Sequence, residues 1–261
     1  EKYDGYTVSA VGYQCLYKNN DIESVVVPNC IQTIGQQAFC QCKNLTSVSL
    51  TDGLKKIETS AFSGCNLDGL TLPASLTKVG ANAFAENISL TDAVILGKTE
   101  FDSGTFKGCK NLVAVSFRNS IRVLPNEMFR ECVKLQNIVF PTEVKKLGGY
   151  IFYRCNLLSE IVIPETVTEI GDYGFAYTAL QTVKIPNGMT EIGNWVFCEC
   201  KNLNNVTIPE TVKIIGEGAF SDCAFVKISL PKRMSQIKNV AFWNCSALRK
   251  IALPEGITVI E

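Results

Sequence analysis

One phrase recurs ten times along the 261 residues of the chain and constrains the fold more than any other feature. The phrase is I-G-x-x-A-F-x-x-C-x-x-L-x-x-[VI]-x-[IL]-P-x-x-[VI]-x-x, and it repeats every 22 or 23 residues. A short fixed period predicts a solenoid, because one repeat cannot bury its apolar face alone and needs stacked neighbours on both sides. The anchor of the phrase is a phenylalanine, found at Phe39, Phe62, Phe84, Phe106, Phe129, Phe152, Phe175, Phe197, Phe220 and Phe242.

Each repeat has two halves with different periods. The first half, for example residues 34–39, has apolar residues at positions i, i+4 and i+5, which predicts about one helical turn with an inward face. The glycine after the isoleucine predicts a tight bend or a positive φ. The second half, for example residues 158–164, alternates apolar and outward residues, which predicts a short strand that the proline ends. Stacked coils then pair these strands into one parallel sheet, on the order of 50 Å long.

The two halves together predict an α/β repeat solenoid of the leucine-rich-repeat type, with one parallel sheet and short helical or 3-10 turns on the opposite side. Residues 1–21 do not fit the repeat and alternate apolar with polar side chains, so we expect an N-terminal cap there. Residues 22–261 are expected to form one solenoid domain of about ten coils, with the last coil truncated. Because Ile257 and Ile260 belong to a coil without a successor, we expect self-association through the C-terminal coil.

The repeat resembles the BspA-like leucine-rich repeats, which occur in surface proteins of host-associated bacteria and some protozoa. The I-G-x-x-A-F-x-x-C-x-x-L core and the V-x-I-P strand end, as in residues 206–209, carry the resemblance over about residues 22–260. The resemblance implies a secreted or cell-surface protein that acts as a non-enzymatic binding or adhesion module. It also implies a protein partner on a host or neighbouring cell, such as an extracellular-matrix or cell-surface protein.

Most of the twelve cysteines share one position of the repeat, three residues after the anchor phenylalanine. Asn87 and Thr178 fill this position in the two remaining repeats, so it favours a small side chain that forms weak hydrogen bonds. We predict a structural ladder of reduced thiols inside the solenoid, turned toward backbone carbonyls. The ladder consists of Cys42, Cys65, Cys109, Cys132, Cys155, Cys200, Cys223 and Cys245.

A disulfide between ladder cysteines is the less favoured alternative. Equivalent residues of stacked coils lie about 4.8 Å apart with parallel Cβ vectors. A disulfide instead needs Cβ atoms about 3.8 Å apart that face each other. Cys15, Cys30, Cys40 and Cys198 lie off the ladder, and a disulfide among the first three stays open.

The composition argues against several classes of function. The chain has no histidine, so the commonest general base and metal ligand are absent, and we expect no catalytic residue. The pairs at 40/42 and 198/200 lie far apart, so we expect neither a metal site nor a cofactor. Charge is balanced at 25 basic and 25 acidic residues without a basic patch, so nucleic acid is not an expected partner. No apolar run approaches the roughly 20 residues of a spanning helix, so we expect no direct membrane insertion.

Two surface patterns call for a choice between a structural and a functional interpretation. N-x-[ST] sequons begin at Asn44, Asn87, Asn205 and Asn244, and they would carry glycans only in a eukaryotic secretory setting. We favour the interpretation that turns and strand exteriors simply prefer these residue types. The acidic residues after the strand proline, such as Glu165, form a broken stripe that we interpret as a solvated edge.

Aromatic residues outside the repeat core are the first candidates for a partner-binding site. Tyr150, Tyr173 and Trp195 stand two residues before the anchor in three consecutive coils, and Tyr153 and Tyr177 stand just after it. Most other coils have small or polar residues at the Tyr150 position, so the repeat does not require aromatic rings there. Stacking would bring the rings together, and Tyr and Trp are enriched in interface hot spots. The alternative is that these rings only shield the surface of the solenoid.

The outward residues of the predicted strands form a rival surface, centred on Asn137, Val139, Glu160 and Val162. Repeat proteins often bind extended partners on such a face. Two further functions stay open: a structural spacer of a cell-envelope protein, and a carbohydrate-binding module that uses the Tyr and Trp cluster.

Overall fold

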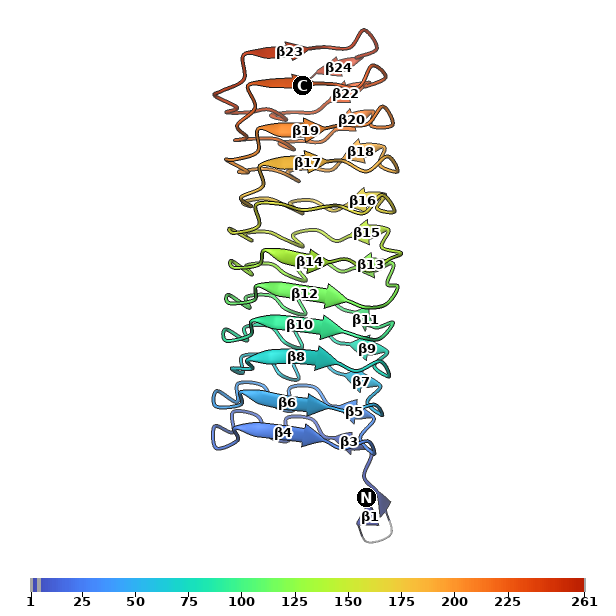
Figure 1. Cartoon of the computed structure of the whole chain (residues 1–261), viewed down its shortest axis with the longest axis vertical. Coiled ribbons are helices and arrows are strands. Elements are labelled where there is room, and N and C mark those ends of the chain that lie inside the picture. Colours follow the sequence, from blue (N-terminus) through green and yellow to red (C-terminus); the bar gives the residue numbers. More distant parts are fainter. Residues whose placement is uncertain (1, 4–5, 261) are drawn as a thin grey trace. The chain divides into compact units, whose positions relative to one another are not determined.

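The computed structural model describes residues 2–3 and 6–260 of the chain, and none of these residues lies in a helix. They form short strands joined by turns (Figure 1). The chain divides into two compact units. Unit 1 comprises Glu1–Ile121 and Met128–Thr142, and unit 2 comprises Arg122–Glu127 and Glu143–Glu261.

The strands of unit 1 lie in two rows. The first row contains the strands that end near the repeat proline, in two parallel sheets: β4 (Ser24–Val27) with β6 (Ser47–Leu50), and β8 (Gly69–Leu72), β10 (Asp92–Ile95), β12 (Ala114–Phe117) and β14 (Asn137–Val139). The second row precedes the anchor phenylalanines and contains β3 (Ala10–Val11), β5 (Thr33–Ile34), β7 (Lys56–Ile57), β9 (Lys78–Val79) and β11 (Glu100–Phe101). Strands of neighbouring coils pair in register, as Ala93 does with Leu70 and Val115, so equivalent side chains stack.

Unit 2 repeats this arrangement. Its first row contains β17 (Thr182–Lys184) paired with β19 (Asn205–Thr207), and β21 (Lys227–Ser229) paired with β23 (Lys250–Ala252). Its second row contains β13 (Val123–Leu124), β15 (Lys146–Leu147) and β16 (Glu169–Ile170), followed by β18 (Glu191–Ile192), β20 (Ile214–Ile215), β22 (Gln236–Ile237) and β24 (Val259–Ile260). The prediction of a strand over residues 158–164 is wrong, because no strand is assigned there.

The N-terminal stretch contains a hairpin and a partial coil. β1 (Lys2–Tyr3) pairs antiparallel with β2 (Tyr6–Thr7). From β3 onward the chain already follows the repeat: Leu16 takes the place of the anchor, and its N–H donates to the carbonyl of Ala38 at 2.8 Å. The division into a cap over residues 1–21 and a solenoid over residues 22–261 stays a prediction.

The parallel-strand solenoid is confirmed, but the prediction of helical or 3-10 turns on its far side is wrong. In the turn segment of the Phe39 coil, the N–H groups of Gln37, Phe39 and Gln41 donate to carbonyls of the next coil at 2.7 to 3.0 Å. The N–H groups of the residues between them donate three residues back within their own coil. A helix satisfies its N–H groups within its own segment, whereas here every second N–H holds the neighbouring coil. The single sheet is also corrected to two rows, each divided into several sheets.

This turn segment uses a left-handed backbone at two positions in every coil. The positive-φ residues two before the anchor are Gln14, Gln37, Ser60, Asn82, Gly104, Glu127, Tyr150, Tyr173, Trp195, Gly218 and Val240. Those two after it are Lys18, Gln41, Gly64, Glu86, Gly108, Glu131, Arg154, Tyr177, Glu199, Asp222 and Asn244. Of the two alternatives for the glycine after the isoleucine, a tight bend or a positive φ, the positive φ is wrong. That glycine permits a close approach of coils, since a Cβ at Gly148 would lie 2.4 Å from the backbone nitrogen of Asn126.

The core of each unit is a column of stacked anchor rings. Within each unit, consecutive anchors have ring centroids 5.0 to 5.8 Å apart, for example Phe39 with Phe62 at 5.0 Å and Phe220 with Phe242 at 5.6 Å. The anchors from Phe39 to Phe220 are buried. Because each ring fills the space between its neighbours, removing one opens a cavity in the column.

The ladder cysteines lie beside this column and are buried and free of disulfides. Each thiol with a defined partner donates to the carbonyl of the anchor residue one coil earlier, as Cys65 does to Phe39 at 3.0 Å and Cys200 does to Phe175 at 3.2 Å. Asn87 replaces the thiol with an amide that donates to the carbonyls of both Phe62 and Phe84 at 2.9 Å. Burial raises the pKa of the Cys65 and Cys200 thiols to about 12, so both stay protonated near neutral pH.

Candidate functional site

The five aromatic residues singled out by the sequence lie together on unit 2. Tyr150 and Tyr153 follow β15, Tyr173 and Tyr177 follow β16, and Trp195 follows β18. All five side chains are half-buried. They come from the turn segments of three consecutive coils, so the stacking of these coils brings the rings together.

Three of these rings form a continuous stack, which we call the aromatic ladder: Tyr150, Tyr173 and Trp195. Tyr150 and Tyr173 lie 4.8 Å apart between ring centroids with an interplanar angle of 11°, and Tyr173 and Trp195 lie 5.9 Å apart at 6°. Tyr173 therefore has a ring against each of its faces. The indole of Trp195 also fills the space beside Gly218, where a Cβ would come within 2.2 Å of the indole Cε3.

Tyr153 and Tyr177 extend the ladder sideways. Tyr153 meets Tyr150 at 5.5 Å, Tyr173 at 6.4 Å and Tyr177 at 5.3 Å, edge to face in each case. The Arg154 guanidinium lies 5.4 Å from the ring centroids of both Tyr153 and Tyr177. Edge-to-face and cation–π contacts of this kind hold the rings in fixed positions, so the cluster is a preorganised surface.

Four of the five aromatic residues occupy the left-handed positions of the turn segment. The φ angles are 56° at Tyr150, 58° at Tyr173, 61° at Tyr177 and 56° at Trp195. Bulky side chains are uncommon in this conformation, which glycine and asparagine adopt with less strain. Other coils have mostly polar residues or glycine at the equivalent positions, such as Gln37, Asn82 and Gly104, so the repeat itself does not require rings there.

The hydroxyl groups of Tyr173 and Tyr177 are neutral donors near neutral pH, because the pKa of each is raised. Desolvation is the main cause that raises the pKa of Tyr173, and carboxylates nearby, including Glu217 and Asp172, raise it further. Burial likewise raises the pKa of Tyr177, with Glu199 as the next cause. Each of these phenols can therefore donate one hydrogen bond to a carbonyl or carboxylate.

A hollow of about 390 Å³ lies beside Tyr177, lined by Asn156, Thr178, Ala179, Glu199, Lys201 and Asn202 as well. Within it, the Lys201 ammonium lies 3.0 Å from a Glu199 carboxylate oxygen. The Lys201 side chain is 74% exposed and that of Glu199 is 24% exposed. No motif in the sequence indicates this hollow, because its residues come from three coils between positions 156 and 202 and only the stacking of the coils joins them.

The four residues of the rival surface come from both units, and the strand expected around two of them is absent. Asn137 and Val139 lie on β14 in unit 1, and Val139 is 52% exposed. Glu160 and Val162 lie in unit 2 within the stretch that has no strand, and Val162 is 87% exposed. All four side chains are accessible, so the surface stays a candidate for partner binding.

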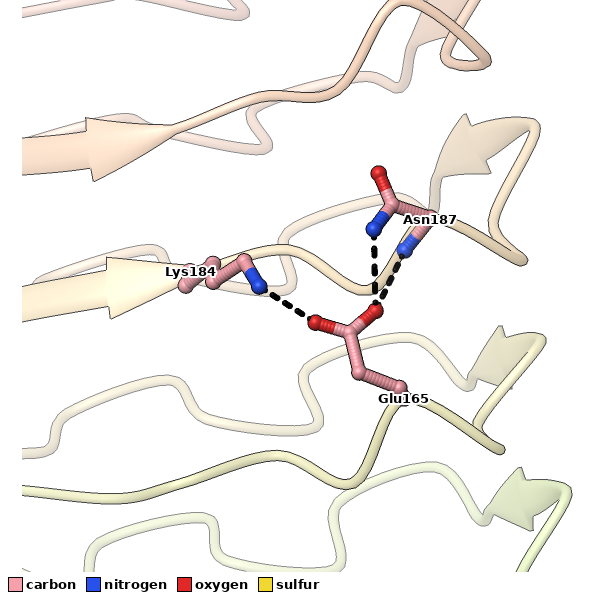
Figure 2. A network of polar contacts seen from close by, with 3 residues as sticks. All are labelled: Glu165, Lys184 and Asn187. Carbon is pink, nitrogen blue, oxygen red and sulfur yellow. Dashed lines mark hydrogen bonds and ion pairs between the residues drawn. The ribbon is translucent and has the colours of Figure 1, made fainter.

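Carboxylates after the strand proline link neighbouring coils. Figure 2 shows Glu165 accepting hydrogen bonds from Lys184 Nζ at 2.5 Å and from the backbone N and Nδ2 of Asn187 at 3.0 and 3.2 Å. The hydrogen bond from Lys184 is the main reason why the pKa of Glu165 is lowered. Glu210 similarly accepts from the backbone N–H of Lys232 at 3.0 Å. The acidic stripe is therefore partly a set of inter-coil contacts and not only a solvated edge.

Within residues 2–3 and 6–260, no group of three or more Cys, Asp or Glu side chains is placed to hold a metal ion. The same residues include no helix with the length and apolar character of a membrane span.

Comparison with known proteins places the repeat in a described family. The chain matches the family model "BspA type Leucine rich repeat region (6 copies)" over residues 9–100, 97–204 and 168–261. No curated protein matches the chain.

Solved structures of bacterial leucine-rich-repeat proteins have the same fold. One from Bacteroides ovatus is 26% identical, with a TM-score of 0.72 over 99% of this chain and 80% of that one. A leucine-rich-repeat protein of T. pallidum is 30% identical, with a TM-score of 0.54 over 59% of this chain and 73% of its own. One from Eubacterium ventriosum is 28% identical, with a TM-score of 0.58 over 60% of this chain and 43% of its own.

Proposed function

Because the chain belongs to the BspA-type leucine-rich-repeat family, we propose that it is a non-enzymatic interaction module, displayed at a cell surface, that binds a protein partner. Leucine-rich repeats are a fold commonly used for protein interaction. The observation that carries the proposal is the aromatic ladder with Tyr153 and Tyr177. Four of the five rings, all except that of Tyr153, occupy left-handed backbone positions that the repeat leaves free in residue type.

The energetics of protein interfaces support this assignment. Tyr and Trp provide rigid amphipathic area at little conformational cost, and truncating a hot-spot ring typically costs about 2 kcal/mol or more. The cross-coil contacts already fix the rings, so binding would lose little further side-chain entropy. A spacer would not need the aromatic rings, because small residues such as Ser60 and Gly104 occupy the equivalent backbone positions in unit 1.

The arrangement of the rings favours a protein over a carbohydrate. Sugars stack their C–H groups on the open face of an aromatic ring. In the ladder, Tyr173 lies between Tyr150 and Trp195, and Trp195 is seated over Gly218. The ladder therefore offers ring edges and phenol hydroxyl groups, which suit the carbonyl groups of a polypeptide.

A two-arm experiment tests the proposal. One variant combines Tyr173→Ala with Trp195→Ala, and the other combines Val139→Glu with Val162→Glu. Each is scored for binding to immobilised extracellular-matrix proteins and to cells, with circular dichroism as the control for folding. We expect the aromatic variant to lose roughly thirtyfold in affinity, equivalent to 2 kcal/mol. If only the strand variant loses binding, the outward strand residues are the site, and if neither does, the spacer function is favoured.

Self-association is a second part of the proposal. The last coil exposes apolar side chains, including Leu253 at 52% and Ile260 at 55%, beside the edge strand β24. Exposed apolar groups promote association. We expect light scattering to detect oligomers of the 261-residue chain, and Ile260→Lys to reduce them; a strictly monomeric chain would contradict this part.

A further inference from the structure

The hollow beside Tyr177 already holds a cation. Lys201 places its ammonium 3.0 Å from Glu199, and the carboxylate of Asp222 also acts on it. The pKa of Lys201 is raised, mainly by its hydrogen bond with Glu199. Because the Lys201 side chain is 74% exposed, this occupant is held from one side only.

The walls of the hollow suit a larger, planar cation. Glu199 provides two carboxylate oxygens, and the side-chain amides of Asn156 and Asn202 provide further acceptors. The Tyr177 ring borders the hollow and already accepts one guanidinium, that of Arg154, at 5.4 Å. A guanidinium can bond both oxygens of a carboxylate at once and stack on an aromatic ring, whereas an ammonium is a compact and strongly hydrated charge.

We propose that this hollow is the specificity pocket of the interaction surface and receives an arginine side chain of the protein partner, which displaces Lys201 from Glu199. The inference rests on the proposed function, since it names the chemistry of the partner at the edge of the same aromatic cluster. The partner segment would lay its backbone along the ring edges and direct one arginine between Tyr177 and Glu199. Lys201 then acts as an internal competitor that lowers the affinity for cations presented without the rest of the partner.

Two substitutions should change binding in opposite directions. Glu199→Gln removes the charge that pairs with the guanidinium, and the backbone should tolerate it because Gln37 and Gln41 adopt the same left-handed conformation. Lys201→Ala removes the competitor from an exposed position. The matched control is Asp52→Asn, which neutralises an exposed carboxylate on unit 1.

The probes are three fluorescein-labelled pentapeptides, in which glycine separates two arginines, two lysines or two glutamates. Fluorescence anisotropy at low salt measures their binding to the protein. We expect the arginine peptide to bind best, Glu199→Gln to weaken it at least about fivefold, and Lys201→Ala to strengthen it about threefold. Asp52→Asn should bind like wild type. Failure of the arginine peptide to bind, weaker binding by Lys201→Ala, or wild-type affinity of Glu199→Gln would each overturn the inference.

The same variants separate this inference from the proposed function. If Glu199→Gln binds the matrix protein or cell like wild type while the Tyr173 and Trp195 double variant does not, the arginine pocket is wrong and the aromatic surface stands. If neither variant changes that binding, the inference and the proposed aromatic site are both wrong. Circular dichroism of each variant shows that a loss of binding is not a loss of fold.

Discussion

The contact between the Trp195 indole and Gly218 predicts that adding a single methyl group at residue 218 strongly lowers the stability of the fold. In Gly218→Ala, the new Cβ would lie 2.2 to 2.5 Å from carbon atoms of the indole, at a residue with φ of 55°. The left-handed conformation costs a non-glycine residue roughly 1–2 kcal/mol. Displacing the ring adds about 1–3 kcal/mol of overpacking and forfeits about 0.5–1.5 kcal/mol of stacking with Tyr173.

Gly108→Ala is a matched control for the backbone part of this cost. Gly108 has a φ of 71°, and the nearest atom to its Cβ would be Glu86 Cγ at 3.5 Å, an ordinary contact. The free energy of unfolding of Gly108→Ala should therefore fall only by the cost of the left-handed conformation, roughly 1–2 kcal/mol. The change in the unfolded state is the same for both substitutions and cancels in the comparison. We expect Gly218→Ala to be less stable than Gly108→Ala by about 2 kcal/mol or more.

Urea unfolding of both variants measures the difference, with constant m-values as the check that the transitions are comparable. Replacing Trp243 with phenylalanine throughout leaves Trp195 as the single tryptophan, so its fluorescence reports the displaced ring directly. If the two variants lose the same unfolding free energy within about 0.5 kcal/mol and the emission spectrum is unchanged, the claim that the indole fills the side-chain space of residue 218 is refuted.

Three further predictions follow from the core and from the contacts between coils. Phe152→Ala should cost about 3–5 kcal/mol in urea unfolding, because the ring is fully buried in the anchor column, and a loss below about 1 kcal/mol would contradict this. Thiol titration at pH 8 should find Cys65 and Cys109, each with a pKa of about 12, unreactive until the chain is denatured; a Cys132–Cys155 disulfide in mass spectrometry would disprove the ladder. The lowered pKa of Glu165 means that its contacts stabilise the fold above its unfolded pKa of about 4.5 and that this contribution is lost as pH falls through the lower folded value. Glu165→Gln should therefore flatten the acid side of the stability profile, and an unchanged profile would show that the contacts with Lys184 and Asn187 contribute nothing.

The period of the sequence was sufficient to predict the parallel solenoid and which side chains it buries. A coil of 22 or 23 residues must place Phe39, Phe62 and their equivalents at the same level of successive coils, and the anchors from Phe39 to Phe220 are indeed buried. The position of the ladder cysteines followed from the same reasoning. In such a fold the register between stacked coils decides which side chains are buried, and the period of the repeat predicts that register directly.

The turn segments could not be predicted in the same way, because their hydrogen bonds join different coils. The pattern of Ile34, Ala38 and Phe39 matches one helical turn, yet the N–H of Phe39 donates to Ala61 in the next coil. Local spacing describes contacts within a segment and contains no information on a partner 22 residues away. For the same reason local spacing predicts a tight bend or a positive φ at the glycine after the isoleucine, whereas its role is to let two backbones approach.

The candidate site was likewise predictable from the sequence only in part. The sequence identified the five aromatic residues, because they depart from the repeat at fixed positions. Only the tertiary structure determined that the ring faces of Tyr173 are covered and that a hollow forms between Tyr177, Glu199 and Lys201. Ring orientation depends on the left-handed backbone of the turns and on the side chains of adjacent coils, and both exist only after the coils have stacked.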